Sequence, residues 1–108
     1  MDNVLVNWDP GNALASGDIP YPTGYRYIEP YMINLHIKDT VAQPEIEMKL
    51  LNDGGVNWIG QLVDIYRHNK LPYVTLETHV FPLLESTTID LERLRVLFDA
   101  VEKLTAEN

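Results

Sequence analysis

Three side chains that can bind a divalent metal ion lie near the ends of three separate segments: Asp9, His36 and Glu77. Each segment alternates apolar and polar residues, which is typical of a strand, where alternate side chains share a face. Two carboxylates and one imidazole form a donor set suited to Mn²⁺, Mg²⁺, Co²⁺ or Zn²⁺. In each segment the residue two positions earlier, on the same face, is small and polar: Asn7, Asn34 and Thr75. This repetition predicts one metal site built from three neighbouring strands.

Taken singly, each of these three residues has an ordinary structural interpretation. His36 near a strand end could be a hydrogen-bonded histidine without a metal, and Asp9 before Pro10 could organise a turn. Glu77 is harder to explain in this way, because a carboxylate on a buried strand needs a partner. Their occurrence in register favours a shared metal site over three separate explanations.

Two further polar residues are candidates for contacts with a substrate. Lys38 lies on the same strand face as His36 and could hold a substrate oxygen or simply pair with Asp39. His79 shares a face with Glu77 and lies beyond the end of the predicted strand. Both residues therefore extend the candidate site beyond the three ligands.

The segments that must position these residues alternate between strand and helix patterns. Strands are predicted over residues 4 to 9, 32 to 38 and 73 to 78, and helices over residues 22 to 31, 57 to 69 and 88 to 104. Such alternation predicts an α/β fold with parallel strands joined by right-handed crossovers. In sheets of this kind, ligands bind beyond the carboxyl ends of the strands. The three candidate metal ligands fall there.

The opposite face of each predicted strand is apolar, and we expect the helices to cover it. Burying one face of a sheet under helices is the usual way to build a two-layer core. The members of this predicted face are Val4, Val6, Trp8, Ile33, Leu35, Ile37, Val74 and Leu76.

The predicted helices differ in the strength of their signals. Asn57 can cap the second helix. Asp90 and Glu92 suit the positive N-terminal end of the last helix. The first helix is short because Pro30 cuts it. A turn is predicted over residues 9 to 12, followed by a polar loop. Residues 40 to 55 are predicted to form a loop on the side of the site, with a short strand over residues 47 to 51.

Composition limits the classes of partner. The chain has 108 residues, no cysteine and a formal net charge of -8. This charge opposes binding to nucleic-acid phosphates and to an anionic membrane surface, so neither partner is expected. The lack of cysteine excludes disulfides and thiolate metal sites and fits a reducing compartment. With no secretion signal or apolar span recognisable, a cytoplasmic location is predicted.

Four motifs occur along the chain in this order: Asn7-Trp8-Asp9-Pro10-Gly11-Asn12, Leu35-His36-Ile37-Lys38-Asp39, Gly54-Gly55-Val56-Asn57-Trp58 and Leu76-Glu77-Thr78-His79. Together they resemble the C-terminal part of the xylose isomerase-like barrel superfamily, and most closely its sugar-phosphate isomerase and epimerase members. The resemblance covers nearly the whole chain. It implies that the three strands are the sixth to eighth of an eight-stranded TIM barrel, so that the chain forms one partial domain of three β/α units.

The same resemblance implies roles for individual residues. Asp9, His36 and Glu77 match three of the four metal ligands, and Glu77 also matches the catalytic acid or base. Asn12 and Lys38 match positions near the substrate. The fourth ligand, a glutamate on an earlier strand, has no counterpart in these 108 residues. Asn12 stands where the abasic-site DNA endonucleases have a histidine, which together with the net charge disfavours a DNA-repair function.

The expected function is that of a metal-dependent sugar or sugar-phosphate isomerase or epimerase. Glu77 would move a proton next to a carbonyl group through an enediolate, and the substrate would be a small sugar. The alternative is a truncated, non-catalytic remnant that acts as a structural or interaction piece. Three strands leave open sheet edges, so association with the missing barrel half or with a second copy is a further hypothesis.

Overall fold

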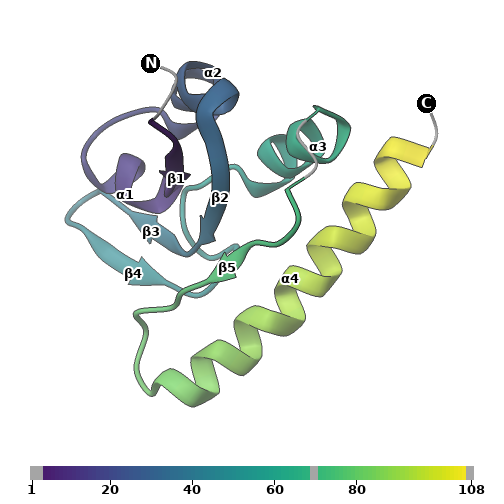
Figure 1. The fold of residues 1–108 in the computed structure, drawn as a ribbon. Helices are drawn as coiled ribbons and strands as arrows, with labels where there is room; N and C mark the ends of the chain where they lie inside the picture. Colours follow the sequence, from purple (N-terminus) through teal and green to yellow (C-terminus); the bar gives the residue numbers. More distant parts are fainter. Residues whose placement is uncertain (1–3, 69–70, 107–108) are drawn as a thin grey trace.

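The centre of the fold is a parallel sheet of three short strands (Figure 1). The protein is described by a computed structural model that covers residues 4–68 and 71–106. The strands are β1 (Val6–Trp8), β2 (Met32–Ile37) and β5 (Thr75–Leu76), in the order β1-β2-β5. β2 pairs in parallel with both neighbours. The predicted α/β fold with parallel strands side by side is therefore confirmed.

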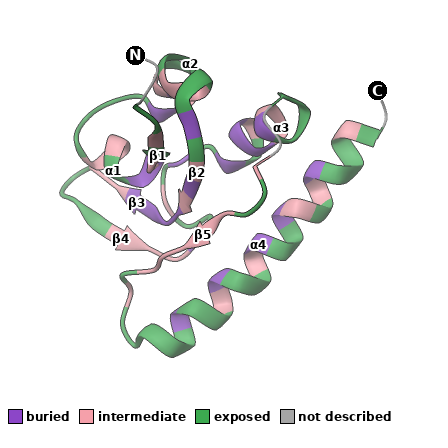
Figure 2. Cartoon of the chain, viewed as in Figure 1, coloured by how far each residue is buried: buried purple, intermediate pink, exposed green. Residues whose placement is uncertain are grey.

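β2 carries a buried apolar face and a polar face (Figure 2). Leu35 and Ile37 are fully buried, as the predicted apolar face requires. The prediction is wrong for Ile33, which is 51% exposed, and for Val4, which is 45% exposed and precedes β1. The register between β1 and β2 shifts at this end of the sheet, so that Ile33 has no residue opposite it and Met32 is buried instead.

The hydrophobic core joins the sheet to two helices, α3 (Trp58–His68) and α4 (Leu83–Ala106). Asn57 caps α3 as predicted, because its Oδ1 accepts the backbone N–H of Gly60 at 2.9 Å. The predicted end of this helix at residue 69 lies outside the described residues. The core consists of Tyr25, Met32, Leu35, Ile37, Leu51, Val56, Trp58, Leu62, Ile65, Leu94, Leu97 and Val101.

The longest helix, α4, begins at Leu83, ahead of the predicted start at residue 88. Leu83 and Leu84 are both exposed, so the first turn carries no apolar period that the sequence pattern could reveal. Asp90 is consequently not at the helix terminus as predicted, but buried two turns into the helix. Neither α4 nor any other helix in the described ranges is long and apolar enough to cross a membrane.

A short helix, α1 (Pro10–Ala15), replaces the turn predicted after β1. Proline at the first helical position loses no hydrogen bond and has a suitable φ. The side chain of Asp9 caps the helix, since its Oδ1 accepts the backbone N–H of Asn12 at 2.9 Å. The turn-like sequence Asp-Pro-Gly-Asn is therefore a helix start, with the aspartate as its N-cap.

The segment before β2 contains three short helical pieces instead of the single helix predicted over residues 22 to 31. They are η1 (Pro20–Gly24), α2 (Tyr25–Ile28) and η2 (Glu29–Tyr31). The backbone of Tyr21 is extended inside the first piece, just before Pro22, and Pro30 is the second residue of the last piece. Prolines thus divide this segment more finely than predicted.

The predicted loop after β2 contains a small antiparallel sheet of β3 (Asp39–Val41) and β4 (Glu47–Lys49). β4 lies inside the short strand predicted over residues 47 to 51, whereas β3 was not predicted. Each strand has only three residues, which is too short for alternation of polarity to give a clear signal. The hairpin lies beside β2 and β5 in Figure 1.

Candidate metal centre

The strand order brings the three predicted metal ligands together at the carboxyl ends of the parallel strands. Asp9 follows β1, His36 lies in β2 and Glu77 follows β5. One possible ligand atom from each residue lies within 4.8 Å of the other two. His36 Nδ1 is 3.9 Å from Asp9 Oδ2 and 3.8 Å from Glu77 Oε1. Ligands of one divalent ion lie roughly 3 to 4 Å apart, with bonds of about 2.1 Å. The three side chains therefore fit a common ion after small movements.

Hydrogen bonds between β2 and β5 hold the polar faces in register. The backbone N–H of Glu77 donates to the carbonyl oxygen of Ile37 at 2.9 Å. On the polar face, Asn34 Nδ2 donates to Thr75 Oγ1 at 3.0 Å. Asn34 and Thr75 are the small polar residues that precede His36 and Glu77 on the same face. Their hydrogen bond joins the two strands and places His36 beside Glu77.

Helix α1 orients Asp9. One carboxylate oxygen caps the helix through the backbone amide of Asn12, and the other faces His36. The side chain of Asn12 is exposed, and its predicted role in binding substrate stays a prediction. A Cβ atom at Gly11 would lie only 2.8 Å from the carbonyl oxygen of Lys38. Glycine at this position therefore permits the close approach of α1 to β2.

Lys38 places an ammonium group between the two carboxylates. Its Nζ lies 3.2 Å from Asp9 Oδ2 and 3.2 Å from Glu77 Oε1, and its side chain is only 9% exposed. Of the two partners considered for Lys38, pairing with Asp39 is therefore wrong. Adjacent strand residues point to opposite faces, so Asp39 is directed away from the site.

His79 and Lys38 determine the charge of Glu77. His79 Nε2 lies 3.2 Å from Glu77 Oε1. The hydrogen bond with His79, followed by that from Lys38, lowers the pKa of Glu77 below its usual value, although partial burial opposes this shift. Glu77 is therefore ionised at neutral pH. The predicted proximity of His79 to Glu77 is present, whereas its contact with substrate stays a prediction.

A second buried carboxylate, that of Asp39, organises the loop behind the site. Its two oxygens accept backbone N–H groups from Thr40, Asn52, Gly54 and Val56 at 2.9, 2.9, 3.2 and 3.3 Å. The hydroxyl of Thr40 also donates to the carbonyl oxygen of Gly11 at 3.0 Å, which ties the loop to α1. From the sequence, Asp39 was expected only as a possible ion-pair partner of Lys38. Strand alternation was the available signal, because it places this carboxylate on the buried side, where it needs donors.

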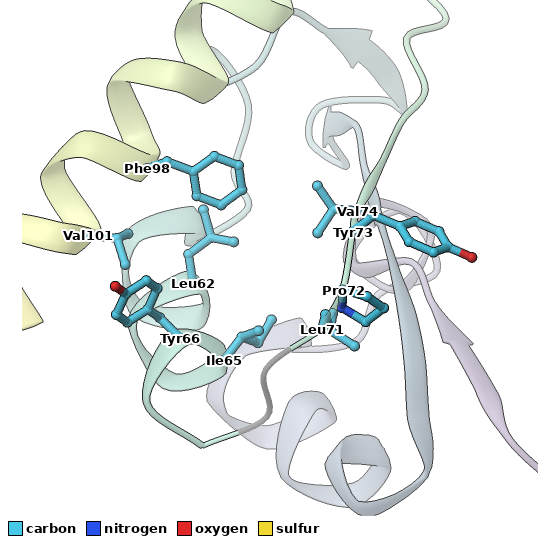
Figure 3. Close-up of a pocket in the computed structure, with 9 residues that line it drawn as sticks. All are labelled: Leu62, Ile65, Tyr66, Leu71, Pro72, Tyr73, Val74, Phe98 and Val101. Carbon is cyan, nitrogen blue, oxygen red and sulfur yellow. The ribbon is translucent and has the colours of Figure 1, made fainter.

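An apolar pocket of about 600 Å³ lies between α3, α4 and the segment before β5 (Figure 3). None of the candidate metal ligands lines it, and among the described residues its lining carries no charged side chain. Apart from the two tyrosines, the described lining is therefore apolar and separate from the candidate metal centre. Its lining residues are Leu62, Ile65, Tyr66, Leu71, Pro72, Tyr73, Val74, Phe98 and Val101.

The fold is similar to that of the crystal structure of a xylose isomerase domain protein from Planctomyces limnophilus. The TM-score is 0.75 at 17% sequence identity, and the match covers 100% of this chain and 41% of that chain. At this identity the likeness shows the fold alone. No protein-family model and no curated protein matches the sequence. A partial barrel of the xylose isomerase type is thus confirmed as the fold, and the sugar-phosphate isomerase and epimerase subfamily stays a prediction.

Proposed function

We propose, from this xylose isomerase-like fold, that the chain is the C-terminal, metal-binding part of a metal-dependent sugar or sugar-phosphate isomerase or epimerase. The observation that carries the proposal is the convergence of Asp9, His36 and Glu77 from three different strands. The likeness to part of a xylose isomerase domain protein supports the fold on which the proposal depends.

The proposed chemistry is proton transfer next to a carbonyl group. A divalent ion held by the three ligands would polarise the carbonyl oxygen and stabilise the negative charge that develops on it. Glu77 is ionised and would take the proton from the neighbouring carbon, giving an enediolate. Delivering a proton to the former carbonyl carbon, while the hydroxyl proton of the other carbon passes to the former carbonyl oxygen, isomerises the sugar. Delivering a proton to the carbon that lost one, from its opposite face, epimerises the sugar. A second carboxylate, expected from an earlier barrel strand, would act on that opposite face.

Lys38 and His79 support this role of Glu77. Both contact Glu77 Oε1, the oxygen that faces His36, so they hold the carboxylate in its orientation toward His36. His79 is half-exposed, and its Nε2 lies 3.2 Å from this oxygen. Lys38 is buried and supplies positive charge where the enediolate would carry negative charge.

Metal binding is tested by isothermal titration of the 108-residue chain with Mn²⁺. Asp9→Asn, His36→Gln and Glu77→Gln should each weaken binding by about tenfold or more, because each replaces a carboxylate or an imidazole with a neutral amide, which is a weaker ligand. The matched exposed controls Asp99→Asn, His68→Gln and Glu102→Gln should leave binding unchanged. A folded wild-type chain that binds no Mn²⁺ would contradict the proposal.

Proton transfer is tested separately by NMR in D₂O, which follows deuterium incorporation next to the carbonyl of D-fructose and D-fructose 6-phosphate. This partial reaction requires one base and one ion rather than a complete barrel. We expect Mn²⁺-dependent incorporation that Glu77→Gln abolishes and Glu102→Gln preserves. Metal binding without incorporation above that of buffered Mn²⁺ would instead favour the non-catalytic alternative.

We further propose that the open strand edges pair with the other barrel half or with a second copy. In the described residues β1 and β5 each pair on one side only, and β2 alone has two neighbours. Unpaired edges favour association with another strand. Sedimentation analysis should therefore show association of the 108-residue chain. A well-folded monomer at all concentrations would refute pairing with a second copy and leave the other barrel half as the remaining partner.

A further inference from the structure

Lys38 contacts the same two oxygens that a metal ion would use. Its Nζ is 3.2 Å from Asp9 Oδ2 and from Glu77 Oε1, the atoms that face His36 Nδ1 at 3.9 and 3.8 Å. Lys38 and His36 share a face of the strand because they are two residues apart. The ammonium group is therefore part of the candidate metal centre and not a neighbour of it.

The ion pairs of Lys38 are weakly screened by water, because its side chain is nearly inaccessible to solvent. A charge removed from water is tolerated only with a close opposite charge, and Asp9 and Glu77 provide it. Lys38 adds one positive charge to the two negative charges of these carboxylates, so the three side chains together carry a charge of -1 instead of -2. A divalent ion therefore meets a weaker electrostatic attraction than the two carboxylates alone would exert.

We propose that Lys38 is an internal competitor of the metal ion and sets its affinity. A divalent ion bound to Asp9 Oδ2 and Glu77 Oε1 would share both oxygens with Nζ, which lies 3.2 Å from each of them, and two cations held by the same oxygens repel each other. Lys38 must then leave at least one of its carboxylate partners. The inference rests on the proposed metal-binding function and adds the residue that limits the binding.

The test is isothermal titration with Mn²⁺ of the wild-type chain, Lys38→Met, Lys38→Arg and Lys103→Met. Methionine has nearly the length of lysine without its charge, and we expect Lys38→Met to bind Mn²⁺ about tenfold more tightly or better. Lys38→Arg keeps the charge and should show no gain. Lys103 lies on the exposed surface of α4, and Lys103→Met should bind within about twofold of wild type.

Thermal unfolding with and without Mn²⁺ covers the case in which Lys38→Met folds poorly. Folding of this variant only with Mn²⁺ would support the inference, because the carboxylates would then depend on the ion as their counter-charge. Wild-type binding with equal or weaker binding by folded Lys38→Met would overturn the inference and leave the proposed function intact. If Lys38→Met binds Mn²⁺ and the wild-type chain does not, the inference is supported and metal use by the wild-type chain is contradicted. Absence of binding in every folded variant would overturn both.

Discussion

Asp39→Asn is the substitution whose effect on folding the structure specifies best. Asp39 is almost fully buried, and each of its carboxylate oxygens accepts two backbone N–H groups. Asparagine has nearly the same shape but presents only one acceptor oxygen, and its NH₂ group cannot accept. Two of the four N–H groups must therefore face another donor, whichever way the amide is turned.

The expected loss of stability follows from these two bonds. A hydrogen bond to a charged acceptor contributes about 1.5 to 3 kcal/mol, and a buried N–H left without an acceptor costs about 1 to 3 kcal/mol. Relief of the buried charge offsets part of this loss, so we expect Asp39→Asn to lower the free energy of unfolding by about 3 kcal/mol. Asp39→Ala loses all four bonds and should cost more than about 4 kcal/mol, a large part of the stability of a small domain.

Urea unfolding followed by the fluorescence of Trp8 and Trp58 measures this loss, with circular dichroism as the second probe. Asp99→Asn is the matched control, because Asp99 is exposed on α4 and should change stability by less than about 0.5 kcal/mol. The reasoning would be refuted if Asp39→Asn were as stable as Asp99→Asn, since the four N–H groups would then have other acceptors.

Three further predictions concern pH, packing and metal. Burial raises the pKa of Asp90, so this carboxyl contributes stability that is present at low pH and lost as pH rises through its raised pKa. Asp90→Asn should therefore gain stability relative to wild type as the pH rises above about 4, the ordinary pKa of an aspartate, in thermal unfolding. Gly54→Ala should cost about 2 kcal/mol or more in urea unfolding, because its Cβ would lie 2.2 Å from Asp39 Oδ1. Mn²⁺ at a hundred times its Kd should stabilise the chain by about 2.7 kcal/mol, and calorimetry should show that EDTA reverses the gain in Tm.

The parts of the fold that could be predicted are those in which local pattern and tertiary structure agree. Alternation along the three strands predicted that they lie side by side, and the position of ligands at strand ends predicted the clustering of Asp9, His36 and Glu77. Asn57 marked the start of α3 because capping depends only on residues within one turn. The start of α4 has exposed leucines and no comparable capping residue in the sequence pattern, so its position depends on tertiary contacts.

The contacts within the site were harder to predict, because they join residues far apart in the sequence. Lys38 and Asp39 are adjacent and opposite in charge, yet strand geometry separates them and gives each a different set of partners. The donors to Asp39 are mainly backbone amides of a distant loop, and any residue type except proline carries such an amide. No residue pattern identifies these donors before the loop is folded.

The assembly of one site from three strands also affects the kinetics of folding. No short peptide of this chain contains two of the ligands in register, so the site forms only after β2 has paired with both β1 and β5. Such non-local pairings form late, since loop closure precedes them. A bound ion should therefore slow unfolding and leave the folding rate nearly unchanged, because it stabilises contacts that are absent from the transition state. The bound metal would then lengthen the lifetime of the folded state without making the chain fold faster.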